Sequence, residues 1–300
     1  MTLTSFPEIG IALAVLSAAL LTFGNFFQSR GVARVRSARG GLGAAGFWSL
    51  VRNPVWLIGS VLFGLAILAQ LGALAFAPLI VVQPVGVVAL VFASALSAAV
   101  MRRAPSLQEI IAVVVAVSSL GIFVWVAADV SVQTTIVDEQ LIAILIVLLF
   151  VLAVTFGGLA LWRRRAIAPV IYVLLAGLFS GFVATLGKTV ILRVQTAFAT
   201  DDLGIDDTNL LTIACLVGIG VAGALSIYFV QTAHTVNSPE TVVGGLTIVD
   251  PCVAVVLGIT ILGEAAGAPL WSIGVFVVTG AAAIWGVWRL ANLSPAPEKL

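Results

Sequence analysis

The sequence predicts an all-α polytopic membrane protein with about nine transmembrane helices in a single domain, residues 1–300. Hydrophobic residues make up 61% of the chain and charged residues 9%, a composition that a water-soluble surface could not display without aggregation. The apolar residues form continuous runs, which excludes a transmembrane barrel and favours helices that satisfy their own backbone groups. With about 20 residues needed for each crossing, we expect spans at residues 8–29, 54–76, 79–100, 107–128, 141–162, 167–190, 209–231, 240–262 and 270–289.

The first two spans each contain an amide side chain within an apolar run. Span 8–29 is too long for a signal-peptide core and has no Lys or Arg before it, so we expect it to remain as a helix. Asn25 lies near its end, and Gln70 lies in span 54–76. The stretch 40–53 is the weakest point of the nine-span prediction, because a short interfacial or re-entrant helix there would make ten helices.

The third and eighth spans contain similar sequences. VVQPVGVVAL, with Gln83 and Pro84, resembles IVDPCVAVVL, with Asp250 and Pro251, 167 residues later. Each copy is followed by small and β-branched residues, a proline-containing turn and one further span. We therefore predict an internal repeat with a kink at the same depth in both copies. The alternative is that two valine-rich helices align by composition alone.

Nine spans threaded in order place the two copies in opposite directions across the membrane. The third span then runs from outside to inside and the eighth from inside to outside, so that residues of about 8–128 and 140–290 form two inverted repeats. Inverted repeats are typical of secondary transporters, in which one half moves against the other around a site near the bilayer midplane.

The sixth span, 167–190, carries a basic residue on the predicted outer side. Gly177 and Gly181 in this span have a GxxxG spacing, which indicates close helix packing rather than chemistry. Three placements are open for Lys188. It could face a cavity and attract an anionic group, it could pair with Glu264 at a similar depth, or its ammonium could reach the outer headgroups.

The charges predict the orientation of the chain. Positively charged loops stay on the cytoplasmic side, so the N-terminus should lie outside and the C-terminus in the cytoplasm, in the plasma (inner) membrane. The basic segments follow odd-numbered spans and contain Arg30, Arg34, Arg36, Arg39, Arg52, Arg102, Arg103, Arg163, Arg164, Arg165, Arg289 and Lys299. The acidic segments follow even-numbered spans and contain Asp129, Asp138, Glu139, Asp201, Asp202, Asp206 and Asp207.

Asp250 is the leading candidate for a functional residue, because it lies near the middle of the eighth span. An ionisable group at that depth costs at least about 2.5 to 3.5 kcal/mol on insertion scales. Proline inside a span also leaves a carbonyl without its helical donor, which a substrate, an ion or water can contact. The structural alternatives for Asp250 are a permanently protonated side chain and a hydrogen bond to a neighbouring helix. The full set of substrate or coupling candidates is Asp250, Pro251, Gln83, Pro84, Gln70, Asn25, Lys188 and Glu264.

No motif of an enzyme or of a cofactor site is convincing. GLGAAG at residues 41–46 has the spacing of a dinucleotide-binding turn, but no strand precedes it. Cys215 and Cys252 fall within spans, where small thiols are expected to pack rather than to bind metal. A net charge of +1 gives no support to nucleic-acid binding. The expected partners are the lipid bilayer and a small-molecule or cation substrate, with no cofactor, no assigned metal ligands, and a homodimer left open.

Two long segments carry a resemblance to a known group of transporters. FAPLIVVQPVGVVALVFASALSAAV and NSPETVVGGLTIVDPCVAVVLGITILGE, which ends at Glu264, resemble the paired signature helices of the drug/metabolite transporter superfamily. The number of spans, the basic segment FGNFFQSRGVARV, AFAP before Pro84 and LGK at Lys188 are closer to the NIPA-type magnesium transporter family than to the ten-span EamA group.

The departures from the NIPA-type pattern bear on the substrate. That pattern has acidic residues where this chain has Ile67 and Arg103. Mg²⁺ prefers hard oxygen ligands, so their loss weakens a cation function without abolishing it. We therefore expect a secondary transporter of a small organic solute or drug, proton-linked through Asp250. The alternative is a NIPA-like divalent-cation (Mg²⁺) transporter, and a third interpretation is a non-transporting scaffold or lipid-handling subunit.

The arginine distribution generates a topological prediction. A single cysteine placed at Arg36 or Arg164, in a chain without its native cysteines, should be shielded from a membrane-impermeant thiol reagent added outside. One placed at Asp138 or Asp206 should react, because these positions follow even-numbered spans. Labelling at Arg164 from outside would overturn the nine-span orientation.

Overall fold

The computed structural model describes residues 6–39, 51–100, 102, 104–133, 136–161, 168–200, 207–237 and 239–293. In these ranges every regular element is a helix, and nine segments are long and apolar enough to cross a membrane, which confirms the predicted all-α class and the number of spans. The tenth-helix alternative falls mainly on residues 40–50, outside the described ranges. The helices are α1 (Pro7–Arg39), α3 (Pro54–Phe76), α4 (Leu79–Val85), α5 (Val88–Val100), α6 (Leu107–Val130), α7 (Asp138–Leu161), α8 (Pro169–Thr200), α9 (Asp207–Val236), α10 (Pro239–Thr260) and α11 (Leu270–Leu293).

Several spans begin at residues that the sequence marks as helix starts. Asn53 accepts hydrogen bonds from the N–H groups of Val55 and Trp56, at 3.0 and 3.4 Å, at the start of α3. Ser106 and Glu109 form a capping box at the start of α6. These side chains satisfy N–H groups that the first turn of a helix leaves without partners.

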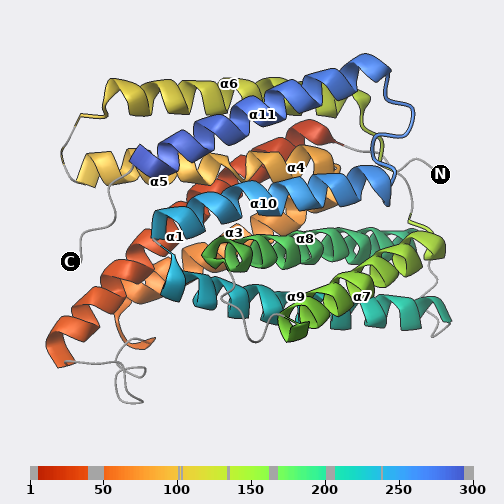
Figure 1. Cartoon of the computed structure of the whole chain (residues 1–300), viewed down its shortest axis with the longest axis horizontal. Helices are drawn as coiled ribbons and strands as arrows, with labels where there is room; N and C mark the ends of the chain where they lie inside the picture. The colour runs from red at the N-terminus through yellow and green to blue at the C-terminus, as the bar shows by residue number, and fades with distance from the viewer. Residues whose placement is uncertain are drawn as a thin grey trace.

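The spans lie side by side along the long axis of the molecule, and the two chain ends lie at opposite ends of the bundle (Figure 1). α1 begins at the end that holds the N-terminus, and α11 runs back to the end that holds the C-terminus (Figure 1). An odd number of crossings has this consequence. The C-terminal ends of α1, α5 and α11, which the basic segments follow in the sequence, all lie at one end of the bundle (Figure 1).

The third span is broken at Pro84, whereas the eighth remains one helix through Pro251. The N–H groups of Gly86 and Val87 each donate to a carbonyl three residues earlier, at 3.1 Å, and this tight turn separates α4 from α5. A kink was expected at both prolines, and the structure has a helix break only at the first. Pro84 is followed after two residues by a glycine, which weakens a helix, whereas the nearest glycine after Pro251 is Gly258.

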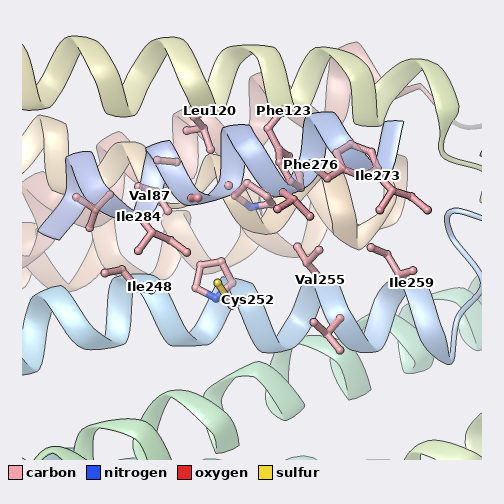
Figure 2. A pocket seen from close by; sticks show the side chains of 18 of the residues that line it. Val87, Leu120, Phe123, Ile248, Cys252, Val255, Ile259, Ile273, Phe276 and Ile284 are labelled. Atoms are coloured by element: carbon pink, nitrogen blue, oxygen red, sulfur yellow. The ribbon is translucent and has the colours of Figure 1, made fainter. Parts of the chain in front are cut away.

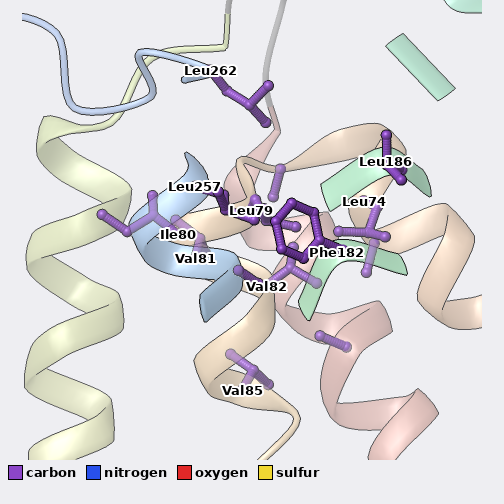
Figure 3. Close-up of a cluster of buried hydrophobic side chains, with 14 of the residues drawn as sticks. Leu74, Leu79, Ile80, Val81, Val82, Val85, Phe182, Leu186, Leu257 and Leu262 are labelled. Atoms are coloured by element: carbon purple, nitrogen blue, oxygen red, sulfur yellow. The ribbon is translucent and has the colours of Figure 1, made fainter. Parts of the chain in front are cut away.

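α4 lies at the centre of the bundle, and all seven of its residues are buried. Its side chains pack against Phe182 and Leu186 of α8 and Leu257 of α10, with Leu74 of α3 close by (Figure 3). Every residue of this helix except Gln83 is apolar, which is expected where neighbours cover a helix completely. The short helix before the break is therefore the core of the protein.

The two halves repeat the same packing order. α1 packs along α3 and against α5, while α8 packs along α9 and against α10; between the halves, α4 packs on α10 and α6 on α11. These contacts favour a correspondence of α1, α3, α4–α5 and α6 with α8, α9, α10 and α11, so that α7 is the extra crossing that inverts the second copy. The repeat stays a prediction, and the packing favours a second copy that begins near residue 169 rather than 140.

Glycines let α8 and α10 approach closely. A Cβ atom at Gly177 would lie 2.6 Å from Cβ of Val249, and one at Gly181 would lie 2.7 Å from Cβ of Val253, distances that real Cβ atoms do not show. The GxxxG spacing therefore marks a packing surface, as expected from the sequence.

This packing predicts that Gly181→Ala destabilises the protein by about 1–3 kcal/mol, because the added methyl group forces α8 away from α10. Gly187→Ala on the same helix is the matched control, since a Cβ there meets nothing within 4 Å. The control should leave stability unchanged or raise it slightly, because alanine favours a helix over glycine. Unfolding of both purified variants in detergent measures the difference, and equal stability would contradict the proposed close contact.

Candidate functional site

The α3–α4 junction, residues 76–79, places two helix ends inside the protein. α3 ends at Phe76, α4 begins at Leu79, and Ala77 between them has no exposed surface. The last carbonyls of one helix and the first N–H groups of the next have no partner within their own helices, and an apolar interior supplies none. The junction therefore requires polar partners from other segments.

Glu264 supplies the partners for the start of α4. Its Oε1 accepts a hydrogen bond from the N–H of Leu79 at 2.6 Å, and its Oε2 accepts one from the N–H of Ile80 at 2.8 Å. The N-terminus of a helix favours negative charge, so the carboxylate suits this position. Burial raises the pKa of the Glu264 carboxyl, while the Lys188 ammonium and the two N–H donors act in the opposite direction.

Glu264 reaches α4 from the loop between α10 and α11. Gly263 just before it has a φ of 69°, a left-handed conformation that other residues rarely adopt. The main-chain carbonyl of Glu264 also accepts the N–H of Val132 at 2.9 Å, which attaches the loop to the end of α6. Glu264 therefore has a specific structural role. Although it follows the eighth span, it caps α4, a helix of the first half.

Lys188 supplies the partners for the end of α3. Its Nζ donates hydrogen bonds to the carbonyl of Leu74, to that of Ala77 at 2.7 Å and to Oε1 of Gln133 at 3.3 Å. Lys188 has no exposed surface, so it does not extend to the outer headgroups. Of the three placements left open by the sequence, an interior position near Glu264 is the one observed, with backbone carbonyls as the direct partners.

Glutamines complete a polar cluster around the junction, which consists of Lys188, Glu264, Gln133, Gln140 and Gln195. We call it the outer polar cluster, after the external side that the charge pattern of the sequence predicts for it. Gln133 and Gln195 each donate to the carbonyl of Ala75, at 3.3 and 3.1 Å. Gln140 donates to the carbonyls of Ile261 and Leu262, at 3.2 and 3.1 Å. A polar cavity of about 10 Å³ between Gln133, Gln140 and Glu264 has room for one water molecule.

Asp250 lies apart from this cluster, at the twelfth of the 22 residues of α10. Its Oδ2 accepts a hydrogen bond from Oγ of Ser180 on α8 at 2.7 Å, while its Oδ1 is buried and has no hydrogen-bond partner among the described residues. The predicted alternative of a bond to a neighbouring helix is therefore half correct, because one carboxylate oxygen has such a bond. A buried carboxylate oxygen without a partner is costly and is the strongest local indication of a ligand contact.

The two repeat prolines meet at one cavity. Pro84 and Pro251 both line a space of about 600 Å³ between α10 and α11, together with Thr247, the residue whose carbonyl Pro251 deprives of its helical donor. Figure 2 shows the apolar side chains of both helices, such as Val255 and Phe276, directed into it. Asp250 does not line this cavity. The space that both prolines line is therefore almost entirely apolar.

The remaining candidates are not gathered at one place. Gln83 is buried beside Pro84, Gln70 is half-buried on α3, and Asn25 is exposed on α1. None of the three makes a hydrogen bond with another candidate in the described part of the chain. Ile67, where the resemblance described above implies an acidic residue, is 46% exposed on α3, so its side chain faces outward.

Ser180 and three of the glutamines escaped the sequence analysis. Ser180 lies between Gly177 and Gly181, which both contact α10. Once these glycines are known to lie in the interface, Ser180 is expected to lie on the same side of α8. Gln133 and Gln140 lie in or beside the loop between α6 and α7, where an amide is unremarkable until the fold brings α3 against it. Only the apolar context of Gln195, at the end of a long helix, could have singled it out.

The described residues can contact a cation but cannot enclose one with protein carboxylates. No group of three or more His, Cys, Asp or Glu side chains within the described ranges could hold a metal ion. A divalent cation would meet one carboxylate, hydroxyls, carbonyls and its own waters, the mode of binding that Mg²⁺ commonly uses.

Comparison with known proteins covers most of the chain. The family model described as magnesium transporter NIPA matches residues 6–219, from α1 into α9, a range that includes Lys188 but not Asp250 or Glu264. Human magnesium transporter NIPA4 is 25% identical over 186 residues, which are 57% of this chain and 45% of the human protein, so the chain spans less than half of that relative's length. No solved structure matches the chain. The nine spans and the extent of the family match together establish that this chain is a multi-pass membrane protein belonging to the NIPA magnesium transporter family, within the drug/metabolite transporter superfamily.

Proposed function

We propose that the chain carries a divalent cation, Mg²⁺, across the membrane, with Asp250 as its central carboxylate contact. The observation that carries this proposal is the free, buried Oδ1 of Asp250 halfway along α10 in a chain of this family. Mg²⁺ retains several waters and is usually bound through one or two carboxylates, so a single acidic side chain fits its requirements. The family match favours this cation over the organic solute that the sequence suggested first.

A weak site is consistent with transport. An ion must bind well enough to enter and loosely enough to leave. One carboxylate, the adjacent Ser180 hydroxyl and retained water would hold Mg²⁺ less firmly than a cage of several acidic groups. In alternating access, the two inverted halves would expose this position to each side in turn.

A second candidate substrate rests on the cavity between Pro84 and Pro251. Its volume of about 600 Å³ lies within the range of small-molecule sites, and its lining is almost wholly apolar. An apolar or amphipathic organic solute fits such a lining better than a hydrated cation does. Proton linkage through Asp250 belongs to this candidate as well, because the carboxylate lies on the same helix as the lining residues.

The proposed orientation has the N-terminus outside and the C-terminus in the cytoplasm of the plasma membrane. Arg30 and Arg34 lie toward the end of α1, and Arg289 lies near the end of α11, both at the end of the bundle that holds the C-terminus. Asp138 begins α7 at the opposite end. In this orientation the outer polar cluster lies on the external side and Asp250 near the midplane.

The proposal predicts Mg²⁺ uptake by the purified protein in liposomes that contain a Mg²⁺-sensitive dye. Asp250→Asn should lower the initial rate by about 10- to 150-fold, the loss expected when a charge-assisted contact worth about 1.5 to 3 kcal/mol is removed. Asp129→Asn is the matched control, since Asp129 is an exposed carboxylate at the end of α6 and its loss should leave uptake unchanged. Full uptake by the Asp250→Asn protein would remove Asp250 from the pathway.

The same liposomes separate the candidate substrates. Flux of organic cations and amino acids is measured with and without a pH gradient. Mg²⁺ flux without organic flux supports the proposal, and proton-driven organic flux without Mg²⁺ flux replaces it with the second candidate. The absence of both fluxes from correctly folded protein would favour the scaffold interpretation.

A further inference from the structure

The end of α3 forms a cage of oxygen atoms around the Lys188 ammonium. The carbonyls of Leu74 and Ala77 and the Oε1 of Gln133 all accept hydrogen bonds from Nζ, so each of its three donors has a partner. The three acceptors come from two separate segments, the last turn of α3 and the segment after α6. This arrangement resembles the coordination shell of a small cation more than the surroundings of a salt bridge.

The charges around the cage favour a positive occupant. Among the described residues no carboxylate forms an ion pair with Lys188, and its main electrostatic partner is Glu264, which is itself bonded to α4. The carbonyl end of α3 contributes the negative pole of its helix dipole. Arg193, one turn further along α8, pairs with Asp138 and with the carbonyl of Ile136, so it does not compete for these oxygens.

Helix ends and unwound carbonyls at such breaks hold free cations in other transporter folds. Here the ammonium reaches the oxygens on a side chain of α8 and has no exposed surface. We propose that the cage formed by Leu74, Ala77 and Gln133 is a monovalent-cation site whose built-in occupant is the Lys188 ammonium. The α3–α4 junction is therefore held by a cation that cannot dissociate, and its stability does not depend on ions in solution.

Removing the occupant should make the site dependent on an added cation. Lys188→Ala removes the ammonium and most of its stem, and the oxygens left without partners should lower the Tm of the purified protein by about 5 °C or more. Propylammonium chloride should then raise the Tm in a saturable manner, because the cation has the size and charge of the missing atoms. Tetramethylammonium chloride, which has the same charge and no N–H donor, should not.

Lys188→Met is the matched control. Its side chain fills the path of the lysine stem and leaves no room for a free cation, so propylammonium should not raise its Tm, nor that of the unmodified protein. An equal rise in all three proteins, or an equal effect of tetramethylammonium, would overturn the proposal. So would a Lys188→Ala protein that folds with unchanged Tm.

A second measurement does not depend on the folding of a variant. The chain has two lysines, Lys188 and Lys299, so a sample with ¹⁵N-labelled lysine side chains gives a simple spectrum of ammonium groups. A caged, fully hydrogen-bonded ammonium should exchange its protons slowly with water and give a protected signal, which Lys188→Met should remove. The absence of a protected signal from the unmodified protein would show that the ammonium is solvated and would overturn the proposal.

Discussion

The structure depends on satisfying the backbone groups of two helix ends that are buried between α3 and α4. Water supplies such partners at the surface of a soluble protein, but neither lipid nor an apolar core can do so. Here a buried carboxylate binds the N–H groups that begin α4, and a buried ammonium binds carbonyls that end α3. Each charge is placed at the helix end whose dipole it complements. Without these two charges, the start of α4 and the end of α3 would carry unpaired polar groups, each with a large desolvation cost.

This arrangement also joins the two halves of the chain. The junction belongs to the first half, whereas Lys188 comes from α8 and Glu264 from the loop after α10. Gln140 and the N–H of Val132 connect the same loop to the region between α6 and α7. The outer polar cluster is therefore closed and well satisfied. The middle of α10 differs, because Asp250 retains a buried oxygen without a partner. A network whose polar groups are all hydrogen-bonded is suited to a structural role. A carboxylate oxygen without a partner is suited to binding a ligand reversibly.

The family match and the geometry bear on different parts of the molecule. The match ends within α9 and so includes Lys188, the junction and Pro84, but it stops before Asp250, Pro251 and Glu264. The matched range thus covers the first six spans and the beginning of the seventh. Asp250, the carboxylate that we propose as the central contact, lies on α10 beyond the match, whereas Ser180 on α8 lies within it.

The sequence by itself determined the class, the number of spans and most helix starts, because lipid leaves a continuous apolar run no alternative to a helix. It missed the ends of α1 and α8, which continue to Arg39 and Thr200 and so extend ten residues beyond the predicted ends at 29 and 190. It also identified the break at Pro84 and the packing role of Gly177 and Gly181, which follow from local covalent geometry and side-chain size. Only the tertiary structure determined which backbone groups Lys188 and Glu264 bind. Lys188 binds carbonyls 111 and 114 residues away, and Glu264 binds N–H groups 184 and 185 residues away, so no local pattern records either pairing. The packing of neighbouring helices also determined that α10 continues through Pro251, and it determined which polar side chains face each other. Both are properties of the packed bundle rather than of any local segment.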